Sequence, residues 1–278
     1  MKIYFGDNQF LGVNHSSGKG NDYLQKYETA ELIADTLRDA WNVGIRDFSF
    51  TVNKKTIKAI KLVKTECPFN LHPSLPYAHR INDLVLDKGL AGAIIFKIKQ
   101  FGLLSLISAG LSSMFNKNKK MLKLLILSEL DGIPMENVRS IGLLNIATDF
   151  LLGSKRTDLL SDFYSVVSKE FNCKPMFYTM NFEKLADALW GQGYTDCAIV
   201  FNFNKSSFRT NPSLKSLRKA IRKFEDRETI AMSLFSGSKP EEVSEVLAQV
   251  PSLSGALFGS SKKENIQTNF KLLNLQRE

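Results

Sequence analysis

The chain has 278 residues, of which 44% are hydrophobic and 23% are charged, a composition typical of a globular protein and not of a disordered or fibrous one. Lysine and arginine number 37 against 28 acidic residues, and the net charge of +9 favours anionic ligands such as nucleotides and sugar phosphates. The N-terminal segment lacks the apolar stretch of a secretory signal, and no run of about 18 apolar residues occurs, so we expect a cytoplasmic protein without a membrane span.

The cysteines and the basic clusters further narrow the classes of protein to which the chain can belong. Cys67, Cys173 and Cys197 are widely spaced and lack the pattern of a zinc site or a CxxC motif, so we expect reduced thiols. Basic residues cluster at 117–123 and 215–223, within or beside expected helices, where a solvated helix face accounts for them. Since no nucleic-acid-binding motif accompanies them, nucleic acid is not an expected partner.

Short apolar runs alternate with amphipathic segments along most of the chain. The expected strands are 2–5, 45–51, 69–74, 138–146, 175–179, 197–203, 230–235 and 255–258. The expected helices are 28–42, 54–64, 158–170, 182–190, 213–224, 236–250 and a last one that begins after 261. Such alternation implies parallel strands with right-handed crossovers. Eight units in this length predict a single α/β domain over 1–278, a (βα)8 TIM barrel, with a doubly wound open sheet as the alternative.

Residues 92–131 interrupt this rhythm after the third expected strand. They have the pattern of one or two amphipathic helices around the basic turn 115–120, which is longer than a barrel crossover needs. We expect an enlarged helical insertion here. The alternatives are a lid, a homodimer contact and, least favoured, a helix that lies on a membrane surface.

Polar side chains gather towards the carboxyl ends of the expected strands, where TIM barrels place their active sites. A packed core has no need of so many amides and hydroxyls, so they indicate a polar, substrate-binding pocket. Arg209 follows the sixth strand and could clamp a carboxylate or phosphate. Lys205 could form a Schiff base, although alternation points it away from the pocket. The polar residues at the strand ends are Asn145, Thr179, Asn181, Asn202 and Asn204.

All three histidines, His15, His72 and His79, fall at the expected carboxyl ends of the first or third strand. Histidine titrates near neutral pH and serves as acid, base or metal ligand. We expect substrate contact at His15 and acid–base work at the other two, with Asp7 or Asp149 orienting one of them. A divalent metal is the alternative, but no HxH or HExxH spacing supports it, so no metal is expected.

A glycine turn follows the last expected strand. Gly259 permits a sharp turn, and Ser261 with Glu264 has the spacing of a capping box, so a helix should begin just after Ser261. The free backbone N–H groups of its first turn, with Lys262 and Lys263 beside them, predict an anion site. The phosphate- or cofactor-binding candidates in this turn are Gly259, Ser260, Ser261 and Lys262.

Three C-terminal segments resemble the aldo-keto reductases: VFNFN at 200–204 followed by Arg209, IAMSLFSGS at 230–238, and GSSKKENIQTN at 259–269. In that family the last segment holds the adenosine phosphate and adenine of a nicotinamide cofactor. The resemblance therefore implies NADPH contacts at Ser260, Asn265 and Asn269, with Asn265 where NADPH-preferring members usually have arginine.

The segment GIRDFSFT at 44–51 also resembles the family's second strand, and Ser49 occupies the position of its catalytic aspartate. The tyrosine, lysine and histidine of the family's catalytic tetrad are not matched either. The resemblance supports the barrel and argues against carbonyl reduction by the usual mechanism.

The sequence favours an enzyme that acts on a small anionic substrate, such as a sugar phosphate or a nucleotide-linked sugar. Cofactor-independent acid–base chemistry of the isomerase, epimerase or lyase type needs only the groups described, with His72 and His79 as acid and base. One alternative is a divergent NAD(P)H-dependent oxidoreductase. The other is a non-catalytic barrel that binds a ligand or partner through 92–131.

Overall fold

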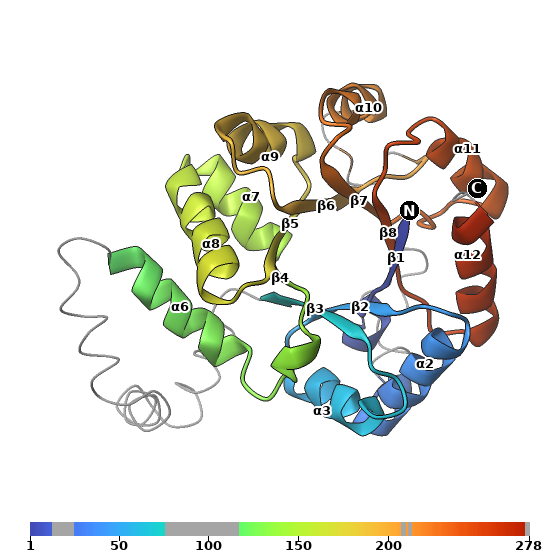
Figure 1. Ribbon diagram of the computed structural model, residues 1–278. Helices are drawn as coiled ribbons and strands as arrows, with labels where there is room; N and C mark the ends of the chain where they lie inside the picture. Colours follow the sequence, from blue (N-terminus) through green and yellow to red (C-terminus); the bar gives the residue numbers. More distant parts are fainter. Residues whose placement is uncertain (13–24, 76–116, 207–209, 211–212, 276–278) are drawn as a thin grey trace, which may run out of the picture.

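The computed structural model describes residues 1–12, 25–75, 117–206, 210 and 213–275. Eight parallel strands close into a barrel in chain order, and the last strand pairs with the first (Figure 1). The predicted TIM barrel is confirmed, and the open sheet is wrong. The strands are β1 (Lys2–Phe5), β2 (Asp47–Thr51), β3 (Asn70–Leu75), β4 (Ser140–Leu143), β5 (Lys174–Thr179), β6 (Ala198–Asn202), β7 (Glu228–Met232) and β8 (Gly255–Phe258).

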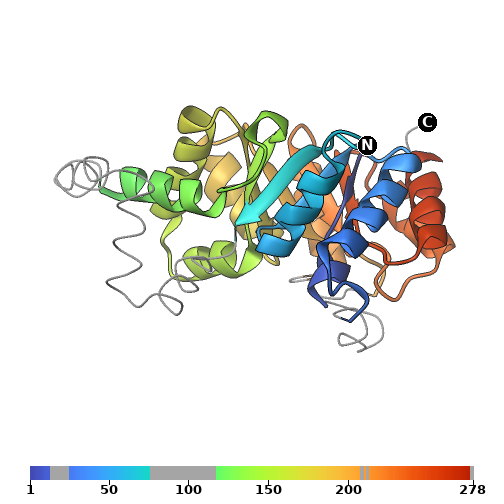
Figure 2. The same ribbon diagram turned by 90° about the horizontal axis from the view of Figure 1, so that it is seen from below.

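Helices form an outer ring around the barrel, as the views along and across its axis show (Figure 1, Figure 2). No helix in the described ranges is long and apolar enough to cross a membrane. The described helices are α2 (Ala30–Asn42), α3 (Lys54–Val63), α6 (Lys117–Glu129), α7 (Asn145–Gly153), α8 (Thr157–Glu170), α9 (Phe182–Leu189), α10 (Leu214–Lys223), α11 (Pro240–Ala248) and α12 (Lys263–Leu275), with short 3-10 turns η1 (Asn8–Leu11), η3 (Met135–Asn137) and η4 (Trp190–Gln192).

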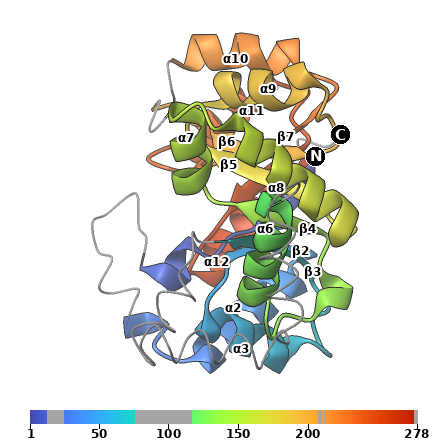
Figure 3. The same cartoon turned by 90° about the vertical axis from the view of Figure 1, so that its left-hand side faces the viewer.

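The helix expected in the second half of the insertion is present as α6, which packs beside α8 (Figure 3). Ion pairs join the two helices, Lys123 to Glu170 at 2.6 Å and Lys119 to Asp162 at 3.5 Å. The part of the insertion at 92–116 lies outside the described residues.

The chain departs from the expected pattern between 143 and 157. The fourth strand was expected to reach 146, but β4 ends at Leu143 and the unexpected helix α7 begins at Asn145. Two contacts hold this helix to the ends of strands: Thr148 Oγ1 donates to the Leu143 carbonyl at 3.1 Å, and Asp149 accepts bonds from the end of β5. Tertiary contacts thus convert an apolar run that resembles a strand into the first turn of a helix.

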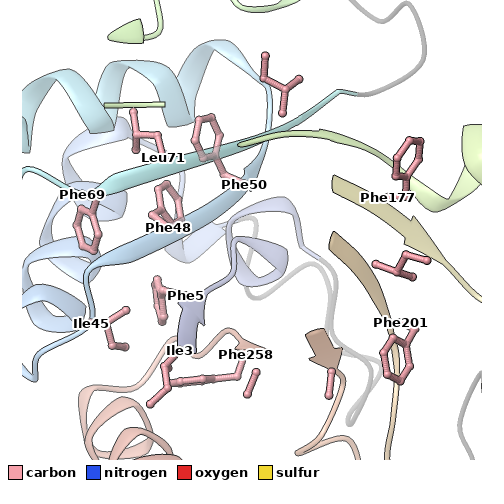
Figure 4. Close-up of a cluster of buried hydrophobic side chains, with 14 of the residues drawn as sticks. Ile3, Phe5, Ile45, Phe48, Phe50, Phe69, Leu71, Phe177, Phe201 and Phe258 are labelled. Carbon is pink, nitrogen blue, oxygen red and sulfur yellow. The ribbon is translucent and has the colours of Figure 1, made fainter. Parts of the chain in front are cut away.

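Alternation along the strands divides the core into two layers. Outward-facing side chains of β1 and β2, such as Phe5, Phe48 and Phe50, are buried under the helix layer (Figure 4). The rings of Phe48 and Phe50 stack with centroids 5.0 Å apart. Inward-facing side chains form a separate cluster inside the barrel, made of Tyr4, Met176, Tyr178, Ala198, Val200 and Ile230.

The barrel interior leaves no room for a side chain at Gly255, because a Cβ there would lie 2.9 Å from the Tyr4 ring and 3.2 Å from Ile230 Cγ1. We expect Gly255→Ala to lower the free energy of unfolding by about 1–3 kcal/mol, the usual result of overpacking a core. Urea unfolding followed by circular dichroism measures this. Gly153→Ala is the matched control, since a Cβ there meets nothing within 4 Å, and equal stability of the two variants would contradict the packed interior.

Candidate functional site

A cavity of about 540 Å³ opens at the rim where the carboxyl ends of the strands meet. Residues at or just beyond the ends of β1, β2, β3, β5, β6, β7 and β8 line it, together with Asn145 at the start of α7. This is the end of the barrel at which TIM-barrel active sites lie. The volume falls within the range of roughly 300–1,000 Å³ that small-molecule and cofactor sites occupy.

Hydroxyl groups form the floor of the cavity. Ser49, Ser74 and Tyr178 project inward from β2, β3 and β5, and the oxygens of Ser49 and Tyr178 lie 2.5 Å apart. Burial, with the nearby Asp7 charge, raises the pKa of Tyr178 to about 12, so the phenol keeps its proton at neutral pH. The two hydroxyl groups bond to each other, and both residues line the cavity, where a ligand can reach them.

Sequence reasoning missed Tyr178 because it chose the other face of its strand. Thr179 and Asn181 were expected in the pocket, but Tyr178 and Met180 line it instead. Thr179 faces the helix layer, where its hydroxyl donates to Asp149 Oδ1 at 2.5 Å and accepts from the backbone N–H of Asn181 at 2.8 Å. Alternation alone gives two faces, and each carries an apolar residue, Met176 on one and Phe177 on the other, so the sequence offered no signal for the inward face.

Asp7 lies just beyond the end of β1 and lines the cavity with only 6% of its surface exposed. Its Oδ2 accepts a hydrogen bond from the backbone N–H of Thr51 at 2.7 Å, which ties the ends of β1 and β2 together. Burial outweighs this bond and raises the pKa of Asp7 to about 7. The carboxyl group can therefore both take and give a proton near neutral pH.

The glycine turn lines the same cavity along its whole length, from Gly259 through Ser260 and Ser261 to Lys262. The Ser260 hydroxyl accepts from the Lys262 backbone N–H at 3.3 Å, just before α12 begins at Lys263. On α12, Asn265 and Asn269 also line the cavity, three and seven residues after Lys262 and so on one face of the helix.

Lys262 is the cation of this wall. Within the described residues it has no acidic partner, whereas the next residue, Lys263, pairs with Asp39 at 3.2 Å. The sequence predicts an anion site from the glycine turn, the first turn of α12 and this lysine, and the structure places all three at the cavity.

The structure places His72 below the cavity. Its ring is 3% exposed, with Nε2 at 2.8 Å from Asp47 Oδ1 and Nδ1 at 2.7 Å from Ser140 Oγ. Asp47 also pairs with Lys2 at 2.9 Å, at the amino-terminal end of the barrel. Burial lowers the pKa of His72, so it is a neutral ring that donates to Asp47 and accepts from Ser140. Its position suits a structural role in the barrel and not acid–base work in the cavity.

Three other sequence candidates also lie outside the cavity lining. Asp149 caps the end of β5, with Oδ2 at 2.9 Å from the Met180 backbone nitrogen. Lys205 pairs with Glu242 and Glu245 of α11, and these bonds raise its pKa, which opposes Schiff-base chemistry. Asn204 is fully buried and accepts from Ser206 at 2.8 Å.

The remaining candidates divide into two groups. Asn145 and Asn202 line the cavity, as the sequence predicts. His15, His79 and Arg209 lie outside the described residues. In the ranges that are described, no three histidine, cysteine or acidic side chains come together as a metal-binding group.

The raised pKa of Asp7 makes a prediction about stability. Folding raises this pKa from 3.8 to about 7, so the unfolded chain releases the proton first, and the folded state loses stability as the pH rises between these values. We expect Asp7→Asn to raise the free energy of unfolding at pH 8 by about 2–4 kcal/mol, at about 1.4 kcal/mol per pKa unit, and to change it little at pH 4. Urea unfolding at the two pH values measures the difference.

Asp47→Asn is the matched control, because Asp47 is a buried carboxylate with ionic partners. Its replacement should destabilise the protein at pH 8. A loss of stability in Asp7→Asn at pH 8 would show that the fold stabilises the Asp7 charge, contrary to our interpretation.

Comparison of the chain with models of protein families gives no match, and comparison with curated proteins gives none either. The structure thus shows a (βα)8 barrel with a polar cavity at the carboxyl ends of its strands.

Proposed function

We propose that the chain is an enzyme that moves a proton on a small anionic substrate, with Asp7 as the base and the Tyr178–Ser49 pair as the hydroxyl donor. The observation that carries this is that a buried carboxyl group and a neutral phenol line one cavity whose wall includes the Gly259–Lys262 turn. Isomerases, epimerases and lyases that act beside a carbonyl need such a base, such a donor and an anchor for the substrate.

The roles follow from the chemistry of each group. The phosphate of the substrate would bind the first-turn N–H groups of α12 and the ammonium of Lys262, where the helix dipole favours negative charge. The Asp7 carboxylate would take a proton from the carbon beside the carbonyl. The hydroxyl of the Tyr178–Ser49 pair would donate to the oxygen on which negative charge then develops. The amide of Asn145 would help to hold the substrate.

Hydrogen exchange tests the proton transfer without knowledge of the product. We expect the protein to introduce deuterium from D2O into D-fructose 6-phosphate, D-ribose 5-phosphate or dihydroxyacetone phosphate. NMR of the substrate measures the rate at which its proton signal is lost. The rate should rise with pH through about 7, because only deprotonated Asp7 is a base. Asp7→Asn should lower it by about 100-fold or more.

Asp158→Asn is the control, since Asp158 is an exposed residue of α8 that pairs with Arg156. It should leave the exchange rate unchanged. A panel in which no sugar phosphate exchanges, or an Asp7→Asn variant that exchanges at the wild-type rate, would refute the assignment.

The phosphate anchor has its own test. We expect Lys262→Ala to weaken the binding of these sugar phosphates by about tenfold, the scale of one charge-assisted contact. Isothermal titration calorimetry measures the dissociation constants. Lys263→Ala is the matched control, because that lysine is paired with Asp39 and does not line the cavity. Equal effects of the two variants would place the anion elsewhere.

A nicotinamide-dependent oxidoreductase is the second candidate. Its support is that Ser260, Asn265 and Asn269, to which the resemblance assigns the adenosine part of the cofactor, all line the cavity. Fluorescence titration with NADPH and NADH decides this candidate. Micromolar binding that is lost in a Ser260→Ala, Asn269→Ala variant would favour it, and no binding at millimolar cofactor would remove it.

A further inference from the structure

Two carboxamide groups in the cavity wall have polar atoms without a partner in the described part of the chain, Gln9 Oε1 and Asn202 Nδ2. Both residues are 5% exposed. A buried polar atom without a hydrogen bond costs about 1–3 kcal/mol, and native proteins keep few of them. Each therefore calls for an explanation, and both line the cavity of the proposed active site.

The orientation of Gln9 is fixed by its other atom. Its Nε2 donates to the Gly6 carbonyl at 2.8 Å, and a carbonyl can only accept, so Oε1 is the atom left free. This oxygen lies against Gly259, where a Cβ would overlap it, so the glycine makes room for the carboxamide. The free atom is an acceptor, and it suits a ligand group that carries a hydrogen.

In Asn202 the free atom is the amide nitrogen, a donor, where Gln9 leaves an acceptor free. Its Oδ1 lies 2.7 Å from the hydroxyl of Ser233, which can donate or accept, so one atom of the carboxamide stays free in either orientation. Ser233 itself holds a left-handed backbone, with φ of 62°, which is unfavourable for a residue with a side chain.

The two groups flank one part of the rim. In the order of the barrel, β6 with Asn202 is followed by β7 and β8, and then by β1, with Gln9 just beyond it. The Gly259–Lys262 turn lies between them. A ligand with its phosphate on that turn therefore has a free carboxamide on either side.

We propose that Gln9 and Asn202 bind hydroxyl groups of a polyhydroxylated phosphate ester, so that the substrate is a sugar or polyol phosphate. This inference rests on the proposed function and deepens it. A hydroxyl group can donate to Gln9 Oε1 and accept from Asn202 Nδ2, whereas a carboxylate or phosphate would repel the glutamine oxygen. The site thus separates the ends of the ligand, with its charge at Lys262 and its hydroxyls at the carboxamides.

Isothermal titration calorimetry with D-ribose 5-phosphate, glycerol 3-phosphate and ethyl phosphate tests the proposal, because the last has no hydroxyl group. We expect the wild type to bind at least one hydroxylated ester about tenfold or more tightly than ethyl phosphate, as for hydrogen bonds that satisfy buried groups. Gln9→Met, similar in shape but without the acceptor, should lose this preference and bind ethyl phosphate as before. Asn202→Leu should do the same.

Equal wild-type affinity for all three esters, or a preference that survives in both variants, would overturn the inference and leave the phosphate anchor standing. If no ester binds, the phosphate part of the proposed function fails instead. The inference is then decided by NMR of the Gln9 and Asn202 side-chain amides, assigned with the two variants, during titration with xylitol. Shifts of these signals support it, and their absence overturns it.

Discussion

Closure of the parallel sheet is the constraint on which the rest of the structure depends, because it points the inward-facing side chains of all eight strands towards one barrel axis. The amino-terminal half of that axis is filled by groups that satisfy one another, among them Lys2, Asp47 and His72. One layer higher, Ser49 and Tyr178 close the interior with hydroxyl groups. The cavity begins above this layer, so the packed half of the barrel supports a half that is free to bind.

Two aspartates show how the surroundings decide what a carboxyl group can do. Asp47 has Lys2 and His72 as partners, which together lower its pKa despite its burial, so it is a fixed charge. Asp7 is buried with the backbone N–H of Thr51 as its partner, and its pKa rises to about 7. Burial without an ionic partner is the means by which enzymes bring a carboxyl group to the pKa of a general base.

The sequence predicted the barrel well because strand alternation and strand–helix rhythm are local properties. Alternation along β2 puts Asp47, Ser49 and Thr51 on one face, and the structure has them there, opposite Phe48 and Phe50. Alternation could not decide which face of β5 points inward, because the polar side chain of Thr179 serves a hydrogen bond to Asp149 in the helix layer and not the cavity. That contact joins residues 30 apart, and neither spacing nor composition reveals it.

Depth within the barrel was the second property that sequence could not supply. His72 lies on the inward face of β3, but Ser74, two residues later, is the one that reaches the cavity. Because His72 lies one inward-facing layer below the cavity, it is a buried ring with hydrogen bonds on both nitrogens and not the acid that its position in the sequence suggests. The glycine turn was predictable because a turn and a helix start are encoded within a few residues.

Buried polar atoms without a partner in the described part of the chain occur in the scaffold as well, at Thr229 Oγ1 and Arg218 Nε, but those of Gln9 and Asn202 belong to residues that line the cavity. In the helix layer, Thr179 and Asn181 find partners within the protein, and at the bottom of the barrel His72 does so with both ring nitrogens. At the cavity, by contrast, the protein keeps a buried carboxyl group and two carboxamides with a free atom. Each lowers the stability of the unliganded protein, and a ligand that satisfies them recovers that free energy on binding. Unsatisfied groups that a ligand can reach are what a binding site requires.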